Sequence, residues 1–275
     1  MTARLDVRKM YKLFINGTFV RSESGRSYPL WDGKNFQGNI ARASRKDLRD
    51  AVSAARVAQP RWWALAPQLR GLMLYRLAEM LEGIPGIPED EIARAIDRVL
   101  WYAGWCDKYG ALLSSRNPVA GPHFNCSTPE PMGVVALLAP ERPSLLGTLS
   151  ELLPILVAGN AAIAIASESD PRSAVALAEA VALSDIPPGT VSVLTGFHSE
   201  LAPAIAKHDA IAAIAFSGAD RERWEMLGRE SAASIKRLRP FRVARDSEYF
   251  DDTAESLDAI ADYSEIKTIW HPAGF

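Results

Sequence analysis

Several features that mark a particular chemistry are scarce in this 275-residue chain. It has two cysteines, Cys106 and Cys126, so neither a disulfide framework nor a cysteine-based metal site is expected. No apolar run approaches the roughly 20 residues that span a bilayer, and the first residues lack the apolar core of a secretory signal. The net charge is only −2, which gives no electrostatic basis for nucleic acid or membrane partners. We therefore expect a reduced, soluble, cytoplasmic protein.

The common motifs of α/β enzymes are also absent. There is no G-x-G-x-x-G fingerprint, no G-x-x-x-x-G-K-[ST] loop and no G-x-S-x-G elbow. The four histidines are not spaced as metal ligands, so no metal site is predicted. Cys106 lies among aromatic residues and is expected to pack in a core. Cys126 lies in a polar segment without a neighbouring base or cation, so a reactive thiolate is not expected there.

What the chain does contain is a regular alternation of apolar runs and helical patterns. The runs cover residues 133–139, 161–167, 191–196 and 212–218, and the helical patterns cover 144–160, 171–183, 198–207 and 220–231. Strands that are apolar throughout are buried on both faces, as in a parallel sheet covered by helices. The pattern predicts an α/β fold with a doubly wound parallel sheet.

The flanking segments have other signals. Residues 12–20 predict a hairpin that turns at Asn16-Gly17. A helix should begin after Ser44, with Asp47 completing a capping box, and should end before Pro60. The opposite charge blocks between residues 236 and 255 are typical of an exposed connector, and residues 266–270 predict a final strand.

Seven segments, taken in order, resemble the aldehyde dehydrogenase superfamily. They are KLFINGTFV, AARVAQPRWWALAP, AIDRVLWYAGWCDKYG, PEPMGVVALLAP, LLPILVAGNAAIAIASESDP, IPPGTVSVLTG and AIAFSGADRERW, and the resemblance extends to about residue 238. The end of the chain, LDAIADYSEIKTIW, resembles the family's C-terminus, so an internal catalytic domain is missing. The resemblance implies the NAD-binding half of the fold and a small β oligomerisation arm. The implied regions are a dinucleotide-binding-like domain (1–116 and 132–240), the arm (117–131 and 262–275) and a linker that replaces the catalytic domain (241–261).

The resemblance also implies a vestigial set of cofactor-binding residues. These are Glu168, Gly196, Phe197, Ser217 and Gly218. The chain departs from the family around them. Ile165 stands at the family's ribose-binding Lys, and Ala219, Asp220 and Arg223 replace the Ser, Thr and Gly that approach the phosphates. We therefore expect no NAD(P) binding, or weak binding only.

The family's catalytic residues have no counterparts here. Arg142 stands at the Asn that helps to form the family's oxyanion hole, and Phe241 falls near its general base. The segment that carries the catalytic Cys does not appear, so no catalytic residue is assigned. Thiohemiacetal chemistry needs an activated thiolate, an oxyanion donor and a base.

The sequence therefore favours a non-catalytic family member, a structural or regulatory subunit of an aldehyde dehydrogenase assembly. It would form a homo-oligomer, or a hetero-oligomer with a full-length aldehyde dehydrogenase, and would be poorly soluble or self-associating alone. The alternatives are an NAD-binding module and a residual NAD-dependent aldehyde oxidoreductase completed by a partner subunit. A neighbour's sheet, self-pairing or local repacking by residues 239–262 could cover the surface left by the missing domain.

Overall fold

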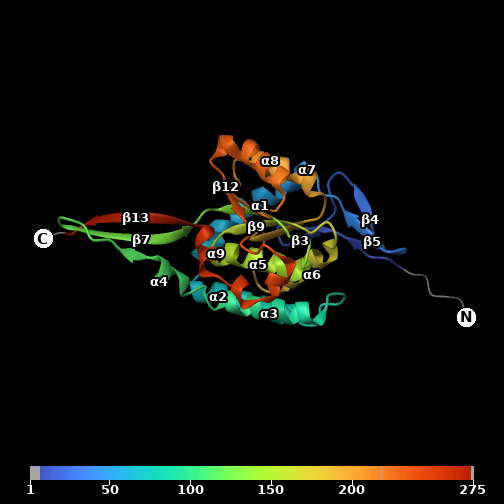
Figure 1. Ribbon diagram of the computed structural model, residues 1–275, viewed down its shortest axis with the longest axis horizontal. Coiled ribbons are helices and arrows are strands. Elements are labelled where there is room, and N and C mark those ends of the chain that lie inside the picture. The colour runs from blue at the N-terminus through green and yellow to red at the C-terminus, as the bar shows by residue number, and fades with distance from the viewer. Residues whose placement is uncertain (1–6, 218, 274–275) are drawn as a thin grey trace, which may run out of the picture.

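The computed structural model describes residues 7–217 and 219–273, so Gly218 lies outside the described residues. Its centre is a seven-stranded sheet with the order β12-β11-β8-β9-β10-β2-β3 (Figure 1). The strands are β12 (Arg237–Pro240), β11 (Ala213–Phe216), β8 (Val134–Leu138), β9 (Ala161–Ile165), β10 (Val191–Leu194), β2 (Leu13–Ile15) and β3 (Thr18–Val20). The first five are parallel, and β2 and β3 add the predicted hairpin in antiparallel orientation.

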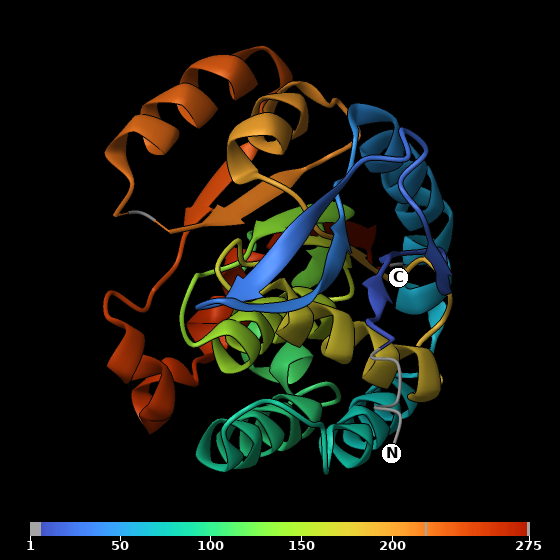
Figure 2. The same cartoon turned by 90° about the vertical axis from the view of Figure 1, so that its right-hand side faces the viewer.

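Helices cover both faces of this sheet, so the predicted doubly wound architecture is confirmed (Figure 2). Helices α5 and α6 pack on one face with α2 and α3 outside them, and α1, α7 and α8 cover the other. The bounds are α1 (Arg45–Ala64), α2 (Pro67–Leu81), α3 (Glu89–Ala103), α5 (Ser144–Val157), α6 (Pro171–Leu183), α7 (His198–Lys207) and α8 (Arg221–Ser231). Among the residues that the structure describes, no helix is both long and apolar enough to cross a bilayer.

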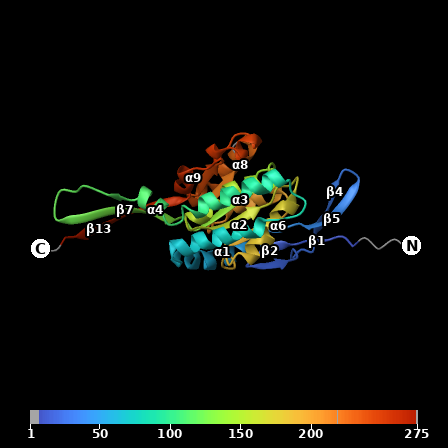
Figure 3. The same ribbon diagram turned by 90° about the horizontal axis from the view of Figure 1, so that it is seen from below.

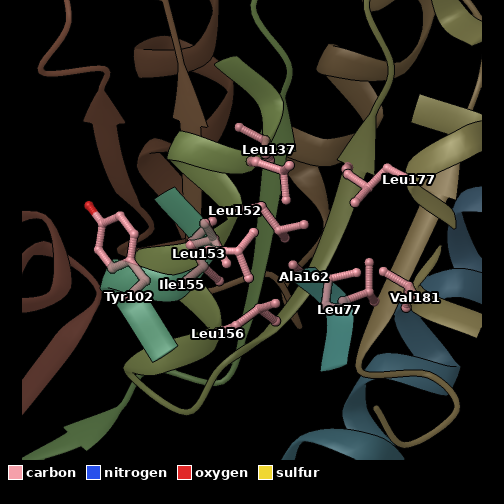
Figure 4. Packing of buried hydrophobic residues seen from close by; sticks show 14 of the residues in the cluster. Leu77, Tyr102, Leu137, Leu152, Leu153, Ile155, Leu156, Ala162, Leu177 and Val181 are labelled. Carbon is pink, nitrogen blue, oxygen red and sulfur yellow. The ribbon is translucent and has the colours of Figure 1, made fainter. Parts of the chain in front are cut away.

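Strand β8 shows why the apolar runs are strands buried on both sides. All five of its residues are buried. Val135 and Leu137 point to the core beneath α5 and α6, whereas Val134 and Leu138 join the core beneath α1 and α7. Figure 4 shows the first of these cores, where side chains from α5, α6 and the sheet interdigitate. The two-residue period of a strand thus supplies both layers from one apolar run.

The predicted end of the first helix before Pro60 is wrong, because α1 continues to Ala64. The capping box of Ser44 and Asp47 is present as expected. Proline removes one intrahelical hydrogen bond, but the turn after it buries Trp62 completely. The indole Nε1 of Trp62 also donates to the carbonyl oxygen of Leu156 at 2.9 Å. Tertiary packing therefore outweighs the local cost of the proline.

A second, three-stranded sheet lies near the N-terminus, with the order β1-β5-β4 (Figure 1). Its strands are β1 (Met10–Tyr11), β4 (Ser27–Asp32) and β5 (Asn35–Ala41). Residues immediately after β5 meet the end of β10, where the N–H of Ala43 donates to the carbonyl oxygen of Thr195 at 2.8 Å. This contact brings Tyr28 of β4 to the carboxyl ends of the parallel strands, against Phe197.

The third sheet, called the arm below, projects from the body of the molecule (Figures 1 and 3). It contains β6 (Ser115–Arg116), β7 (His123–Pro131) and β13 (Ser264–Pro272), and the short helix α4 (Tyr109–Leu113) leads into it. Strand β13 pairs with β7 along nine residues, from Ser264 opposite Pro131 to Pro272 opposite His123. The expected final strand is therefore confirmed, and it pairs with the segment before β8.

The interpretation of the charged tail as an exposed connector is wrong. The C-terminal segment, defined here as residues 241–263, contains η2 (Asp246–Phe250), η3 (Asp252–Ala254) and α9 (Leu257–Asp262). It packs over α5 and buries Tyr249, Ile260 and Tyr263. Several of its charged side chains are exposed, among them Arg245 and Asp252, which explains why composition alone suggested a solvated linker.

Buried Arg98 of α3 holds the C-terminal segment in place. Its side chain is completely buried. The guanidinium donates to Ser150 Oγ at 2.8 Å, to the carbonyl oxygen of Tyr249 at 2.9 Å and to Glu255 Oε1 at 3.2 Å. A buried cation is tolerated because its donors are satisfied and a carboxylate balances its charge.

Candidate functional site

The carboxyl ends of the parallel strands form the place where a doubly wound sheet binds its ligand. The chain runs from β8 to β9 to β10 and then crosses back to β11 on the other side of β8. Ligands of such sheets bind at the point where the strand order reverses, against the N-termini of the following helices. We call this region, formed by the residues that follow β8, β9, β10 and β11, the carboxyl edge.

At the end of β9, the carboxylate of Glu168 is already engaged. Its Oε1 accepts a hydrogen bond from the backbone N–H of His198 at 2.7 Å. His198 is the first residue of α7, so the carboxylate lies on a helix N-terminus. A helix N-terminus carries unpaired N–H groups and a partial positive charge, which together make it an anion site. In this chain the anion at that position is Glu168 itself.

Glu141, which follows β8, occupies the neighbouring loop. One carboxylate oxygen accepts the N–H of Ser169 at 2.9 Å and the hydroxyl of Ser167 at 2.9 Å, and the other accepts the N–H of Glu168 at 3.2 Å. Burial raises the pKa of this carboxyl, but these hydrogen bonds outweigh burial and hold the pKa below its ordinary value. Glu141 is therefore ionised at neutral pH and adds a second negative charge to the carboxyl edge.

Two more helices begin on carboxylates from this chain. Asp220 caps α8, where its Oδ1 accepts the N–H of Arg223 at 2.9 Å and its Oδ2 lies 3.3 Å from the Arg223 guanidinium. At the start of α5, Glu91 Oε1 accepts the N–H groups of Leu145 at 2.8 Å and Leu146 at 3.1 Å. The N-termini of α5, α7 and α8 thus all face a carboxylate of the chain.

The imidazole of His198 fills space at the same edge. The side chain is buried, and its Nε2 lies 3.0 Å from the carbonyl oxygen of Ala166, so Nε2 carries the proton. Its Nδ1 is buried without a hydrogen-bond partner in the described parts of the chain. Burial, followed by the charge of Arg223, lowers the pKa of the imidazole. His198 is therefore neutral at pH 7 and takes up volume without offering a charge.

The structure brings three of the five predicted cofactor residues together. Glu168, Gly196 and Phe197 meet at the start of α7, where the Phe197 ring lies 5.1 Å from the Tyr28 ring and 5.0 Å from the guanidinium of Arg42. Ser217 is half-buried at the end of β11. The fifth predicted residue, Gly218, lies outside the described residues.

Neither thiol stands at the carboxyl edge. Cys106 is buried after α3, and burial raises the pKa of its thiol to about 12, so the thiol stays protonated. Cys126 lies on β7 of the arm, opposite Ile269. Phe241 packs half-buried after β12 and offers no acid–base group. Arg142 is exposed after β8.

Sequence reasoning missed Glu91, Glu141 and His198. Glu91 is one of three acids in the first turn of α3, and its contact with α5, more than 50 residues later, has no local signal. Glu141 and His198 could have been found by asking which side chains stand beside the expected cofactor residues. Glu141 is adjacent to Arg142 in the sequence and His198 is adjacent to Phe197, and this adjacency could have pointed to them.

Comparison with known proteins identifies the family that shares this architecture. The model of the aldehyde dehydrogenase family matches residues 87–239. The NADP/NAD-dependent aldehyde dehydrogenase PuuC of Escherichia coli (strain K12) is 31% identical over 82% of this chain and 49% of its own length. Retinal dehydrogenase 2 of Gallus gallus is 31% identical over 79% of this chain and 45% of its own length. The chain thus spans about half the length of these curated relatives.

Solved structures agree with the sequence matches. An aldehyde dehydrogenase of Bacillus cereus, solved as an NAD+ complex, superposes with a TM-score of 0.77 at 26% identity, covering 84% of this chain and 50% of the other. PnpE of Pseudomonas sp. WBC-3 gives a TM-score of 0.77 at 27% identity, covering 85% and 51%. The part they share with this chain is the NAD-binding half of the fold. The chain belongs to the aldehyde dehydrogenase family.

Proposed function

We propose that this chain is a non-catalytic member of the family that acts as a structural or regulatory subunit of an aldehyde dehydrogenase assembly. The assembly is a homo-oligomer, or a hetero-oligomer with a full-length aldehyde dehydrogenase. Both cysteines are free thiols, which is in keeping with a cytoplasmic location. The main support for a role in assembly is the exposed apolar arm. The residues at the carboxyl edge support the absence of catalysis.

The residues at the carboxyl edge do not fit a bound dinucleotide. The pyrophosphate of NAD(P) needs free N–H groups at a helix N-terminus and no negative charge beside them. Here Glu168 occupies the N-terminus of α7 and Asp220 occupies that of α8. Two phosphate charges would have to displace two carboxylates, each held by a backbone hydrogen bond. No step of a reaction is therefore routed through NAD(P).

The thiols give no support to an independent activity either. Covalent aldehyde oxidation needs a thiolate that can reach the substrate and the electron acceptor together. Cys106 is protonated and enclosed, and Cys126 stands on the arm. A residual oxidoreductase would therefore need its nucleophile and its cofactor site from a partner subunit.

The arm exposes apolar side chains beside an unpaired strand edge, as a protein–protein interface does before its partner binds. Among the described residues, the helices that contact its strands are short: α4 lies against β7 and α9 against β13 (Figure 3). Ile266 and Trp270 lie on the same face of β13 and are 59% and 61% exposed. Strand β13 is also the edge of its sheet, so its outer N–H and C=O groups have no strand beside them among the described residues. Apolar side chains next to an open strand edge favour pairing with another chain.

Sedimentation velocity on the purified full chain tests the proposal. We expect self-association at micromolar concentration, and we expect Trp270→Lys to weaken it at least tenfold by placing a charge in the apolar face. Trp31→Lys is the matched control, because Trp31 is comparably exposed, at 56%, but lies on β4 away from the arm (Figure 1). A wild-type chain that stays monomeric both alone and when mixed with a full-length aldehyde dehydrogenase, or equal effects of the two variants, would overturn the proposal.

A further inference from the structure

A polar cavity lies between the body of the molecule and the C-terminal segment. Its volume is about 280 Å³, which suits a compact molecule rather than a nucleotide. It is lined by Tyr102, Ser150, Glu151, Arg242, Asp262 and Tyr263, among others. None of the carboxyl-edge residues described above contributes to it. The cavity exists only because the C-terminal segment folds back over α5.

Glu151 of α5 is the buried acid of this cavity. Its Oε1 accepts a hydrogen bond from the hydroxyl of Tyr249 at 3.2 Å. Burial raises the pKa of the carboxyl to about 8, against the smaller lowering effects of Tyr249 and Arg98. The groups that face it are Arg98 and Tyr102 from α3, and Arg242, Tyr249, Asp262 and Tyr263 from the C-terminal segment. None of these cations is free to neutralise it.

The cations near Glu151 are committed to other carboxylates. The Nε of Arg242 lies 2.6 Å from Asp262 Oδ2, and the guanidinium is also within 4.0 Å of Asp258. Arg98 is paired with Glu255. The cavity lining has three carboxyl groups, those of Glu151, Glu248 and Asp262, and one guanidinium, that of Arg242, so it favours a cation over an anion.

The buried hydroxyl of Tyr102 also indicates that the cavity holds a ligand. Its ring is completely buried, and its hydroxyl points away from the leucine side chains of the core (Figure 4). The hydroxyl lies near the backbone N–H of Ser256 but makes no hydrogen bond of normal geometry among the described residues. A buried hydroxyl without a partner costs free energy unless a ligand satisfies it. Tyrosine rings beside a carboxylate also favour organic cations.

We propose that this cavity binds a small primary alkylammonium ion, with the ammonium group on Glu151 and the Tyr102 hydroxyl and the carbon chain against Tyr102 and Tyr263. The site does not rest on the function proposed above, because it lies under a different part of the chain. Binding turns the neutral Glu151 acid into a carboxylate paired with the ammonium group, so one proton leaves the protein for each ligand bound. The proton released is the one that leaves the Glu151 carboxyl group, and no electrons are transferred.

Isothermal titration calorimetry of the full chain with n-butylamine at pH 7 tests the site. We expect saturable binding at ligand concentrations up to about 10 mM, as ligand efficiency allows for so small a molecule. Titrations in two buffers of different ionisation enthalpy should show close to one proton released. 1-Butanol, which has the same chain length and no charge, should bind at least tenfold more weakly.

Variants separate this site from nonspecific binding. Glu151→Gln should weaken butylamine at least tenfold and abolish proton release, and Tyr102→Phe should weaken it several-fold. Glu179→Gln is the matched control, because Glu179 is a surface carboxylate on α6 paired with Lys9, and it should change nothing. Absence of saturation, equal binding of 1-butanol, or full binding by a folded Glu151→Gln or Tyr102→Phe protein would overturn the proposal.

Discussion

Carboxylates of this chain accept backbone N–H groups at the carboxyl edge. Glu91, Glu168 and Asp220 each meet the first turn of a helix, and Glu141 meets the loop before α6. Each such hydrogen bond involves a charged acceptor and is stronger than a neutral one. The same contacts that would hold the phosphates of a ligand therefore stabilise the fold here. The neutral, buried His198 completes the filling of this edge.

Stability should fall as the pH rises because of Glu151. The folded pKa of about 8 lies above the ordinary value of 4.5, so the unfolded chain ionises first and gains stability relative to the folded chain. The loss runs from about pH 4.5 to about pH 8, at up to about 1.4 kcal/mol per pH unit. Urea unfolding of wild type and Glu151→Gln measures it. The variant should lose most of this slope, and parallel pH profiles would contradict the assignment.

A second residue-scale prediction concerns Ile235, which has φ of 49° and is 95% exposed. A β-branched side chain is strained in the left-handed region, and no packing compensates for it here. Ile235→Asn should raise the free energy of unfolding by about 1 kcal/mol, because Asn tolerates this conformation. Val57→Asn is the control on the exposed face of α1, where no gain is expected. Equal effects of both changes in thermal denaturation would contradict the strain argument.

At the scale of elements, the sequence predicted correctly those elements whose formation depends on residues close together in the chain. The four strand–helix units and the hairpin at Asn16-Gly17 follow from apolar periodicity and turn chemistry. The end of α1 was mispredicted because the buried indole of Trp62 keeps the helix intact beyond Pro60. The C-terminal segment was mispredicted because its anchor, Arg98, lies about 150 residues earlier and leaves no trace in the segment's own charges.

Removing that anchor should release the C-terminal segment. Arg98→Met leaves the Tyr249 and Asp251 carbonyl oxygens and the Glu255 carboxylate without their buried donor. We expect a loss of about 3–5 kcal/mol, as for other broken buried ion pairs. Hydrogen exchange should accelerate in residues 246–262 before it does in β8 and β9.

The control for this change is Arg76→Met. Arg76 pairs with Asp185 on the surface, where an exposed ion pair contributes about 0–1 kcal/mol. Its exchange profile should match that of wild type. Unchanged protection of residues 246–262 in Arg98→Met would show that Arg98 is not the anchor.

At the scale of the whole molecule, the chain exposes more surface than a compact protein of its mass. Its accessible surface is 13749 Å², whereas about 11,700 Å² is expected for a 30.0 kDa monomer. The projecting arm contributes to this excess (Figure 1). The fold class and the final strand were predictable from the sequence. The self-filled carboxyl edge was not, because its contacts join residues that follow different strands.

Native mass spectrometry of the full chain, with NAD at a near-stoichiometric concentration, tests the central claim most directly. We predict masses at multiples of 30.0 kDa and no added nucleotide mass, because we expect the arm to associate and because Glu168 and Asp220 occupy the helix N-termini. A 30.0 kDa monomer that carries one NAD would contradict both parts of the account at once.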